Sequence, residues 1–444
     1  MKFHPNDLAL EELYLSQSDE HRAMLAHLVR CARCCGLFRE IIDQLRGKTV
    51  STYEEAIQRV EGTIAAREKV LVRERAEAPA LFVEVMKLSW EQQRLLIRNS
   101  PRFRTWGLLE LLIERAAEMA VNDPEASEGL GFLGLDLGER LDPASYCAGA
   151  IQDLQARAWA YIANARRLKS DFHRAEEAFL KAESYLVKGS QDPVERALYL
   201  DLRSSLLRAQ RRFDEALKVL SEAAAIFRQH GHPHRAGRSL VKMSTVHHCA
   251  GDVVGAIPLL FKALRLIDPE KEPRLLLSAH HNLIDDLAEA GCFIEAQKLY
   301  RQTLPLYRDF PDASTQNRRK WVKGKIFLGL GQVQRAESLF LAAREGFITD
   351  GVSYDVALVS LDLASVYARQ GRTADLRCLA EEMLPIFSSL QIQREALAAL
   401  SFLRQALDAE KASVEVVSRV AEFFRRAQYD SGLRFEVPAV VATS

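Results

Sequence analysis

The stretch Asp252-Val-Val-Gly-Ala-Ile-Pro-Leu-Leu260 returns along this chain, with changes, at a nearly constant interval. Each copy places an alanine four positions before a large apolar residue, and a second small residue, usually alanine, follows three positions later. Positions i, i+4 and i+7 share one face of an α-helix, so the small residues let a second helix approach while the large residue fills the space beside them. The first alanines of the copies are Ala175, Ala216, Ala256, Ala296 and Ala336.

The spacing of these copies predicts a stacked array of helix pairs from about residue 159 to 383. The alanines advance by 41 residues and then three times by 40, and a sixth, weaker copy follows at Leu376, Ala380 and Met383. A helix that ends in a tight turn favours glycine, which accepts positive φ without strain. Glycines precede most copies, at Gly251, Gly291, Gly331 and Gly371. Twelve positions before each copy stands a mostly small residue, as a close helix crossing requires: Ala163, Ser204, Ser244, Ile284, Gly324 and Ala364.

The pattern resembles the tetratricopeptide family, which shares the A-x-x-x-F signature seen at Ala175 and Phe179. The repeat here is about six residues longer than the usual 34, which longer helices would absorb. The resemblance implies an all-α, right-handed α-solenoid of about six or seven helix pairs. Such arrays present binding surfaces and rarely perform chemistry, so it also implies a protein that binds a partner.

A separate motif near the N-terminus carries three candidate metal ligands, in His27-Leu-Val-Arg-Cys31-Ala-Arg-Cys34. At 100° per residue on a helix, Cys31 lies about 40° from His27 on one side and Cys34 about 20° on the other. Three ligands in one narrow stripe suit a tetrahedral zinc, and His4 is the expected fourth ligand. The alternative is a pair of ordinary buried thiols beside a polar histidine.

This motif resembles the zinc-binding anti-sigma domain of bacteria, in which a small helical module binds a sigma factor. The resemblance covers about 45 residues and implies His4, His27, Cys31 and Cys34 as ligands of a structural zinc. A closed four-ligand site leaves no position for a reacting water. The implied partner of residues 1–46 is therefore a sigma-type transcription factor.

A third set of candidates lies on the first helices of successive repeats. In tetratricopeptide arrays these helices line the concave face, where both charge signs and an aromatic suit a peptide or a partner helix. A scatter of solvated polar residues around a core tryptophan is the alternative interpretation. The predicted groove residues are Arg238, His248, His281, Asp285, Arg318, Trp321 and Lys325.

Two further clusters are interpreted as ordinary surface. The sequence His230-Gly-His-Pro-His234 falls at a joint between repeats and has no acidic or cysteine companion nearby. It is interpreted as a solvated turn rather than a metal loop. The basic run 318–325 is interpreted as a charged helix face.

Composition limits the classes of function. The 60 basic and 60 acidic residues cancel, which argues against nucleic acid or an anionic membrane as a partner. No apolar run is long enough to span a bilayer, and the first residues have no signal-peptide pattern. Seven cysteines, unevenly spread, do not form a secreted disulfide framework, so we expect a cytoplasmic protein. No local catalytic motif is present, and we expect no enzyme activity.

The chain is expected to contain four parts. Residues 1–46 form the zinc module, 53–104 a helical connector, 105–428 the repeat solenoid with a C-terminal capping helix, and 429–444 a flexible tail. The connector is expected to hold one charged helix over 53–77 and a second over 81–98. Asp-Pro pairs at 123, 142, 192 and 268 are expected to mark joints between helices.

These features together predict a bacterial regulator in which the N-terminal module holds a sigma factor and the solenoid binds a second protein or peptide. The alternative is a scaffold or adaptor that docks onto an effector complex such as a protease or nuclease. A peptide-sensing receptor would share the solenoid. Such a receptor would normally carry a DNA-reading helix-turn-helix, which is not seen before Thr52.

Overall fold

In the computed structural model of this protein, every regular element of the described residues is a helix. The structure describes residues 31–46 and 54–389, together with residues 10, 13, 24–25, 27–28, 416–417, 419–420 and 422–423. The expected all-α class is confirmed. His4 and the tail at 429–444 lie outside the described residues, as does most of the expected capping helix.

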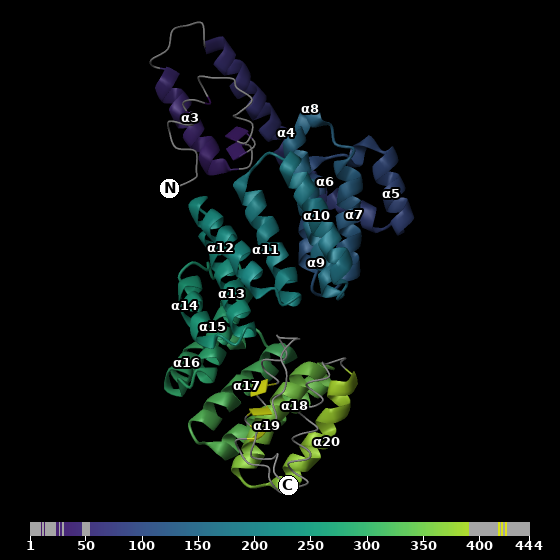
Figure 1. Cartoon of the computed structure of the whole chain (residues 1–444). Helices are drawn as coiled ribbons and strands as arrows, with labels where there is room; N and C mark the ends of the chain where they lie inside the picture. Colours follow the sequence, from purple (N-terminus) through teal and green to yellow (C-terminus); the bar gives the residue numbers. More distant parts are fainter. Residues whose placement is uncertain are drawn as a thin grey trace. The chain divides into compact units, whose positions relative to one another are not determined.

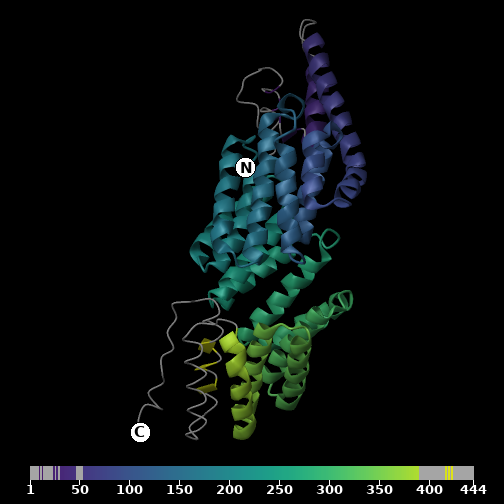
Figure 2. The same cartoon turned by 90° about the vertical axis from the view of Figure 1, so that its right-hand side faces the viewer.

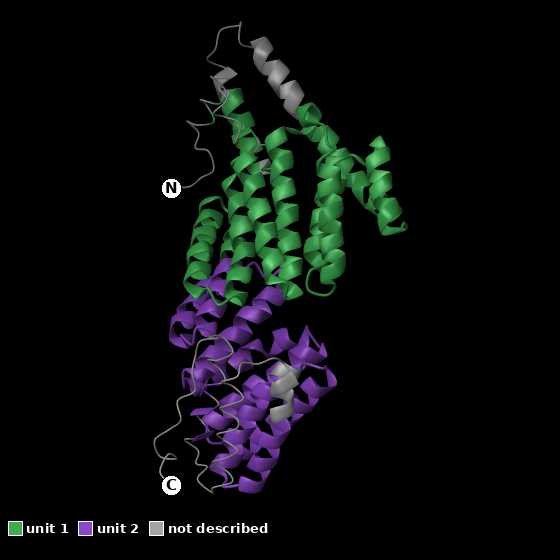
Figure 3. Cartoon of the chain, turned by 45° about the vertical axis from the view of Figure 1, so that its right-hand side comes forward, with its two compact units in different colours: residues 1–236 green, residues 237–444 purple. Residues whose placement is uncertain are grey.

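The chain divides into two compact units, residues 1–236 and residues 237–444 (Figure 3). The boundary falls inside helix α13 (Pro233–Cys249). Each unit is described by itself below.

Unit 1 is a succession of helices, most of which pack against a helix near them in the sequence (Figure 1, Figure 2). The helices before the repeats are α3 (Ala32–Arg46), α4 (Glu54–Met86), α5 (Trp90–Asn99), the short 3-10 helix η2 (Pro101–Phe103), α6 (Trp106–Met119), α7 (Pro124–Gly138) and α8 (Pro143–Tyr146). The repeat pairs that follow are α9 (Ala148–Leu168) with α10 (Phe172–Lys188) and α11 (Pro193–Ala209) with α12 (Phe213–Gln229).

Unit 2 continues the same alternation of first and second helices. Its helices after α13 are α14 (Val253–Leu264), α15 (Pro273–Glu289), α16 (Phe293–Arg308), α17 (Ala313–Gly329), α18 (Val333–Thr349), α19 (Ser353–Arg369) and α20 (Thr373–Ser389). Helices adjacent in sequence pack together, as in α15 with α16, α17 with α18 and α19 with α20.

The repeated small and large residues form the core between the helices, as the sequence predicts. All five anchor alanines are fully buried, and so is the large residue that follows in most copies: Phe179, Leu220, Leu260, Tyr300 and Phe340 have exposed fractions of 0–6%. The sixth copy is also buried at Leu376, Ala380 and Met383. The 40-residue repeat is therefore a packing repeat.

The turns between paired helices adopt the positive φ that the glycines predict. Gly251 has φ of 82° and Gly291 of 80°. In unit 1 the same repeat position is held by Ser170 at 62° and Arg211 at 63°. Non-glycine residues there accept a conformation that a Cβ disfavours.

The connector helix differs from its expected form. Instead of two helices over 53–77 and 81–98, α4 runs without a break from Glu54 to Met86 and carries Pro79 inside it. The helix packs on α6 through a buried face that includes Leu71, Ala78 and Leu81. That burial stabilises a continuous helix across a proline that would otherwise end it.

Glu74 ties α4 to the helices that follow. Its carboxylate accepts hydrogen bonds from the Trp106 backbone N–H at 2.8 Å and from the Tyr146 hydroxyl at 2.6 Å, and the residue is 5% exposed. A Cβ on Gly107 would lie 2.4 Å from the Glu74 carbonyl oxygen, so only glycine allows this approach. The connector is thus packed by specific contacts against the helices that follow it in unit 1.

Helix N-termini follow the expected Asp-Pro pattern. Asp123, Asp142 and Asp192 each accept a hydrogen bond from a backbone N–H in the first turn of the next helix, and a proline follows each at the first helical position. Asp268 lies in the connection between α14 and α15. These aspartates satisfy donors that a helix start leaves unpaired.

Candidate functional site

Two groups of side chains stand out, one in each unit. The first, here called the polar face, lies on the first helices of successive repeats in unit 2. Its residues are His248 on α13, Asp285, Asp286 and Glu289 on α15, Trp321 and Lys325 on α17, and Asp362 on α19. The second, here called the thiol group, consists of His27, Cys31 and Cys34.

Lys325 is the centre of the polar face. Its side chain is 14% exposed, and its ammonium lies 2.7 Å from a carboxylate oxygen of Asp285 and 3.0 Å from one of Glu289. The ammonium also lies 4.9 Å from the centre of the Trp321 ring, in cation–π geometry. Burial disfavours the ionised form of Asp285 and would raise its pKa. The charge of Lys325, together with His248 and His281, has the larger effect and lowers the pKa of the Asp285 carboxyl to about 2.

His248 and Asp286 form a second charged contact in the same face. Nδ1 of His248 lies 2.6 Å from a carboxylate oxygen of Asp286, which is 2% exposed. Burial disfavours the charged imidazole, but the hydrogen bond to Asp286 and the carboxylates of Glu289 and Asp285 raise the pKa of His248. Burial also raises the pKa of Asp286, against the effect of His248. The donor atoms of His248, Asp285 and Glu289 lie within 4.8 Å of one another, a spacing that suits a metal ion, but the Lys325 ammonium already bridges the two carboxylates.

His281 is kept neutral beside this cluster. Burial lowers the pKa of its imidazole to about 4, and the positive charges of Arg318 and Lys325 act in the same direction against Asp285. Its Nδ1 lies 2.7 Å from the Tyr307 hydroxyl. A neutral imidazole at this place can donate one hydrogen bond and accept another.

Trp321 lies in the polar face and also packs against the core, so both interpretations that the sequence offered for it apply. Its indole N–H donates to Asp362 at 2.7 Å, while its ring meets Phe347 edge-on at 5.8 Å and packs against the buried apolar cluster beside it. Arg318 reaches Asp355 of α19 at 3.5 Å, and Arg238 pairs with Glu272, which precedes α15. Each predicted groove arginine therefore holds an acidic residue one repeat further on.

Sequence reasoning missed the partners Asp286, Glu289, Asp355 and Asp362. The signal was present in the repeat itself, because these contacts join positions about one repeat apart. Lys325 and Asp285 are 40 residues apart, and Trp321 and Asp362 are 41 apart. A search for complementary polar residues at the repeat interval on neighbouring first helices would have found them.

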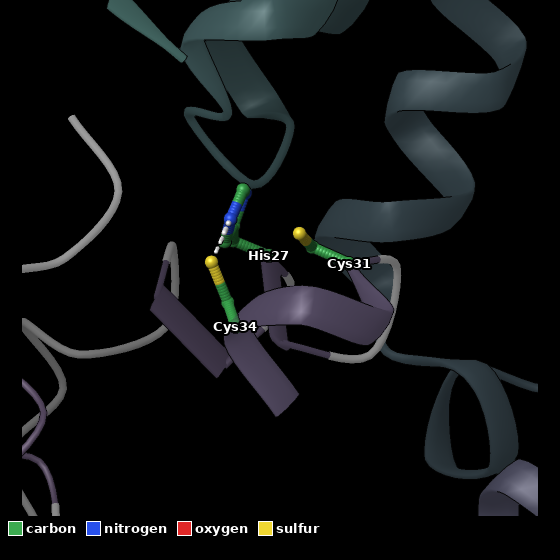
Figure 4. A group of neighbouring side chains, drawn as sticks. All are labelled: His27, Cys31 and Cys34. Atoms are coloured by element: carbon green, nitrogen blue, oxygen red, sulfur yellow. Dashed lines mark hydrogen bonds between the residues drawn. The ribbon is translucent and has the colours of Figure 1, made fainter. Parts of the chain in front are cut away.

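The thiol group has the arrangement that its spacing predicts (Figure 4). The ligand atoms of His27, Cys31 and Cys34 all lie within 4.8 Å of one another, and His27 Nε2 is 3.2 Å from Cys34 Sγ. A tetrahedral zinc sets its nitrogen and sulfur ligands roughly 3.3–3.8 Å apart, so small shifts would fit this donor set to the metal. Cys34 is 1% exposed and belongs to a small apolar core with Phe38 and Ile41. Burial, followed by the neighbouring Cys31, raises the pKa of the Cys34 thiol to about 12.

His230 does not lie on a solvated turn as expected. It caps the C-terminal end of α12 and is only 5% exposed. Its ring meets the ring of His27 at 6.5 Å between centres and 62° between planes. The solvated-turn interpretation is wrong for this residue, because its side chain is buried and lies beside the ring of His27, about 200 positions earlier in the chain.

Among the described residues, no helix combines the length and apolarity needed to cross a bilayer.

Comparison with known proteins gives a fold. No family model matches the chain, and no curated protein does. A Rap protein in complex with competence and sporulation factor matches 72% of this chain and 87% of its own, with 13% identity and a TM-score of 0.55. NprR in complex with its cognate peptide NprX matches 68% of this chain and 85% of its own, with 18% identity and a TM-score of 0.50. Aspartyl phosphate phosphatase F from Bacillus subtilis matches 88% and 95%, with 10% identity and a TM-score of 0.51. At these identities the likeness concerns the backbone alone: the chain has a tetratricopeptide-like helical solenoid fold.

Proposed function

We propose that this protein is a regulator that acts by binding, and that the polar face receives a peptide or an extended segment of a partner protein. The observation that carries the proposal is the cluster of mutually paired charges, with side chains 2–26% exposed, beside Trp321 on consecutive first helices. Charged side chains are rarely withdrawn from water without a partner, and their burial has a desolvation cost. Surfaces that recognise peptides place a few such polar groups beside an aromatic side chain.

The charge of the polar face favours a basic partner segment. Its acidic side chains are Asp285, Asp286, Glu289 and Asp362, against the ammonium of Lys325 and the imidazole of His248. Lys325 is shared between two carboxylates, which leaves acceptor positions on both. An amino terminus, lysine or arginine of a peptide can take those positions, and the Trp321 ring offers a surface for its aliphatic part.

The comparisons support this type of function without assigning it. One solved structure of the same fold is a Rap protein complexed with competence and sporulation factor, and another is NprR with its cognate peptide NprX. A repeat array of this kind can therefore hold a signalling peptide. The proposed role here is binding rather than catalysis.

Panning a library of random linear heptapeptides against the whole protein tests the peptide proposal. We expect enrichment of peptides with a basic residue or a required free amino terminus, and their loss with the Asp285→Asn/Glu289→Gln variant. The matched control is Glu270→Gln, an exposed carboxylate in the connection before α15. Peptides that bind the variant equally well, or no enrichment at all, would contradict the proposal.

We further propose that residues 1–46 form a zinc-binding module that holds a sigma-type transcription factor, with 53–104 as connector, 105–428 as solenoid and 429–444 as tail. The thiol group supports zinc by its residue types and spacing. His27, Cys31 and Cys34 are three of the four ligands that the anti-sigma resemblance implies, with His4 as the fourth. The small core around Cys34 gives such a zinc a structural role.

Affinity purification from a bacterial host tests this finer proposal. The full-length protein is compared with a Cys31→Ser/Cys34→Ser variant, zinc is measured on both, and partners are identified by mass spectrometry. One zinc per chain and a sigma factor, both lost in the variant, support the proposal. Zinc together with a protease or nuclease complex that survives removal of residues 1–46 would establish the scaffold alternative. No zinc on either protein would exclude the module as drawn.

A further inference from the structure

The ring contact between His27 and His230 places a fourth candidate metal ligand beside the thiol group. His27 belongs to the N-terminal motif, whereas His230 follows the last residue of α12 in the repeat array. Both residues lie in unit 1. His230 is 5% exposed, so its imidazole is held against the motif rather than in solvent.

We propose that His230 is the fourth ligand of the zinc bound by His27, Cys31 and Cys34, in the position that the family resemblance would give to His4. This inference rests on the proposed zinc binding of the N-terminal module and goes beyond it. It makes the metal a cross-link between that module and the repeat array. The site is then completed only when both parts are folded and in contact.

In this structure His230 is outside the set of ligand atoms that lie within 4.8 Å of one another, so a shared zinc requires its imidazole to move toward the other three residues. Two imidazoles on one tetrahedral zinc place their ring centres roughly 5 Å apart. The observed 6.5 Å differs by about 1.5 Å, a distance that modest side-chain rotations can cover. The planes of the two rings are inclined by 62°, so the contact is edge-on and the rings are not stacked.

The charge of the completed site also suits its surroundings. Two thiolates neutralise the charge of Zn²⁺, and two neutral imidazoles add none, so the group as a whole is uncharged. A neutral centre is the form that a buried position tolerates best. Cys34 is 1% exposed and His230 is 5% exposed, which agrees with a closed structural site rather than one open to substrate.

The repeat array places His230 reproducibly. The residue occupies the C-cap of α12, where its backbone N–H donates to the Ile226 carbonyl at 2.9 Å, and Gly231 follows with φ of 76°. Its position is therefore fixed by the same turn that joins two repeats. A ligand on a rigid element is what a structural metal site needs.

Metal affinity of the whole protein, measured by competition with a chromophoric chelator, tests the proposal. The variants are His230→Ala, His4→Ala and the matched control His234→Ala on the first turn of α13. We expect His230→Ala to weaken Zn²⁺ binding by about 100-fold or more, exceeding the 10–100-fold typical of outer-shell partners. We expect the other two variants to bind as the unchanged protein does.

A second variant, for which an increase in absorption is expected, distinguishes the loss of a metal ligand from misfolding. His230→Cys keeps four ligands, and with Co²⁺ in place of Zn²⁺ it should raise the thiolate-to-metal absorption by about half, because three sulfurs replace two. No such rise would overturn the proposal, as would an unchanged affinity in His230→Ala. Loss in His4→Ala alone would also overturn it while zinc binding stands. If the protein binds no zinc at all, both the assignment of His230 as a ligand and the proposed zinc module are contradicted.

Discussion

Lys325 shows how much a single charge contributes on the polar face. Its ammonium is shared by Asp285 and Glu289 at a position that is 14% exposed. Removing one partner of a buried ion pair leaves the other charges without compensation. We expect Lys325→Met to lower the free energy of unfolding by about 2–3 kcal/mol, the lower end of the effect for buried pairs because the site is not fully dry.

Thermal unfolding followed by circular dichroism, with hydrogen exchange in α15 and α17, measures this loss. The control Lys271→Met removes an exposed lysine paired with Asp268 and should change stability by less than about 0.5 kcal/mol. Adding Asp285→Asn to Lys325→Met should recover part of the loss, because the two residues are coupled. Equal effects of the two lysine changes would contradict the account.

His281 gives the polar face a pH dependence with a defined sign. Burial lowers the pKa of its imidazole from 6.5 to about 4. Between these values the unfolded chain binds a proton that the folded chain does not, so stability falls as pH falls from about 6.5 to about 4. The shift corresponds to no more than about 3 kcal/mol.

Urea unfolding at pH 7, 6, 5 and 4.5 measures this slope, and His281→Asn should flatten it. The raised pKa of His248 acts in the opposite sense, because its contribution is present below pH 6.5 and is lost as pH rises through the folded value. His248→Asn should therefore remove a gain in stability that the unchanged protein shows as pH falls toward 6.5, and should leave the fall below pH 6.5 unchanged. A slope that His281→Asn leaves unchanged would assign the acid sensitivity to other groups.

The repeat register indicates that His248, Asp285 and Lys325 lie on first helices, but it missed the partners Asp286 and Glu289 and does not give the pairing. Asp285 and Lys325 lie 40 residues apart and so occupy equivalent repeat positions, whereas His248 lies 37 residues before Asp285. Which carboxylate receives the ammonium depends on side-chain direction and on the offset between neighbouring helices. Those quantities come from packing, and the local sequence does not contain them.

At the scale of elements, the turn before α10 contains a non-glycine residue with positive φ, and replacing it by glycine should relieve the backbone strain. Ser170 adopts φ of 62°, the conformation that Gly251 adopts at the same place in a later repeat. A Cβ in this region costs about 1–2 kcal/mol, offset in part by the flexibility that glycine gives the unfolded chain. We expect Ser170→Gly to stabilise the protein by up to about 1 kcal/mol and Gly251→Ser to destabilise it similarly.

The melting temperatures of the two variants provide the measurement, and their opposite signs serve as mutual controls. The change at residue 170 removes an exposed side chain, so lost packing should not mask the effect. A loss of stability on Ser170→Gly would show that the serine contributes more than its backbone conformation.

Helix α4 shows where local rules fail for an element. Pro79 and the charged residues before it predict a break, yet the helix continues to Met86. The contact with α6, together with Glu74 and Gly107, stabilises the continuous form. A proline signal is local, whereas the face that overrides it is visible only when the second helix is present.

At the scale of the whole molecule, charge balance determines how copies interact. The chain has 60 basic and 60 acidic residues and 11 histidines. With histidine neutral the formal net charge is zero, so molecules repel one another weakly, and protonation of histidine below its usual pKa of about 6.5 adds positive charge. We expect weaker self-attraction at pH 6 than at pH 7.5 in low salt, with the difference reduced by 0.3 M salt.

Static light scattering at the two pH values, with circular dichroism to verify that the fold persists, tests this prediction. A second virial coefficient that does not change with pH would show that apolar contacts, rather than net charge, control association.

The 40-residue repeat made the fold predictable at this scale, but it does not predict every contact in the molecule. A regular 40-residue interval specifies helix pairs that stack on their neighbours, because each pair buries its face only against the next. The same regularity gives no indication of the division into two units near residue 236 or of the contact at His230. Both depend on departures from the repeat.

The contact between His27 and His230 has a consequence for the order in which the chain folds during synthesis. Helix pairs of a repeat array form from local contacts and can fold as they emerge from the ribosome. His27 must wait for a partner about 200 residues later, which at 5–20 residues per second is roughly 10–40 s. During that interval His27 and the two cysteines are made before His230, and a chaperone or a metal donor can reach them.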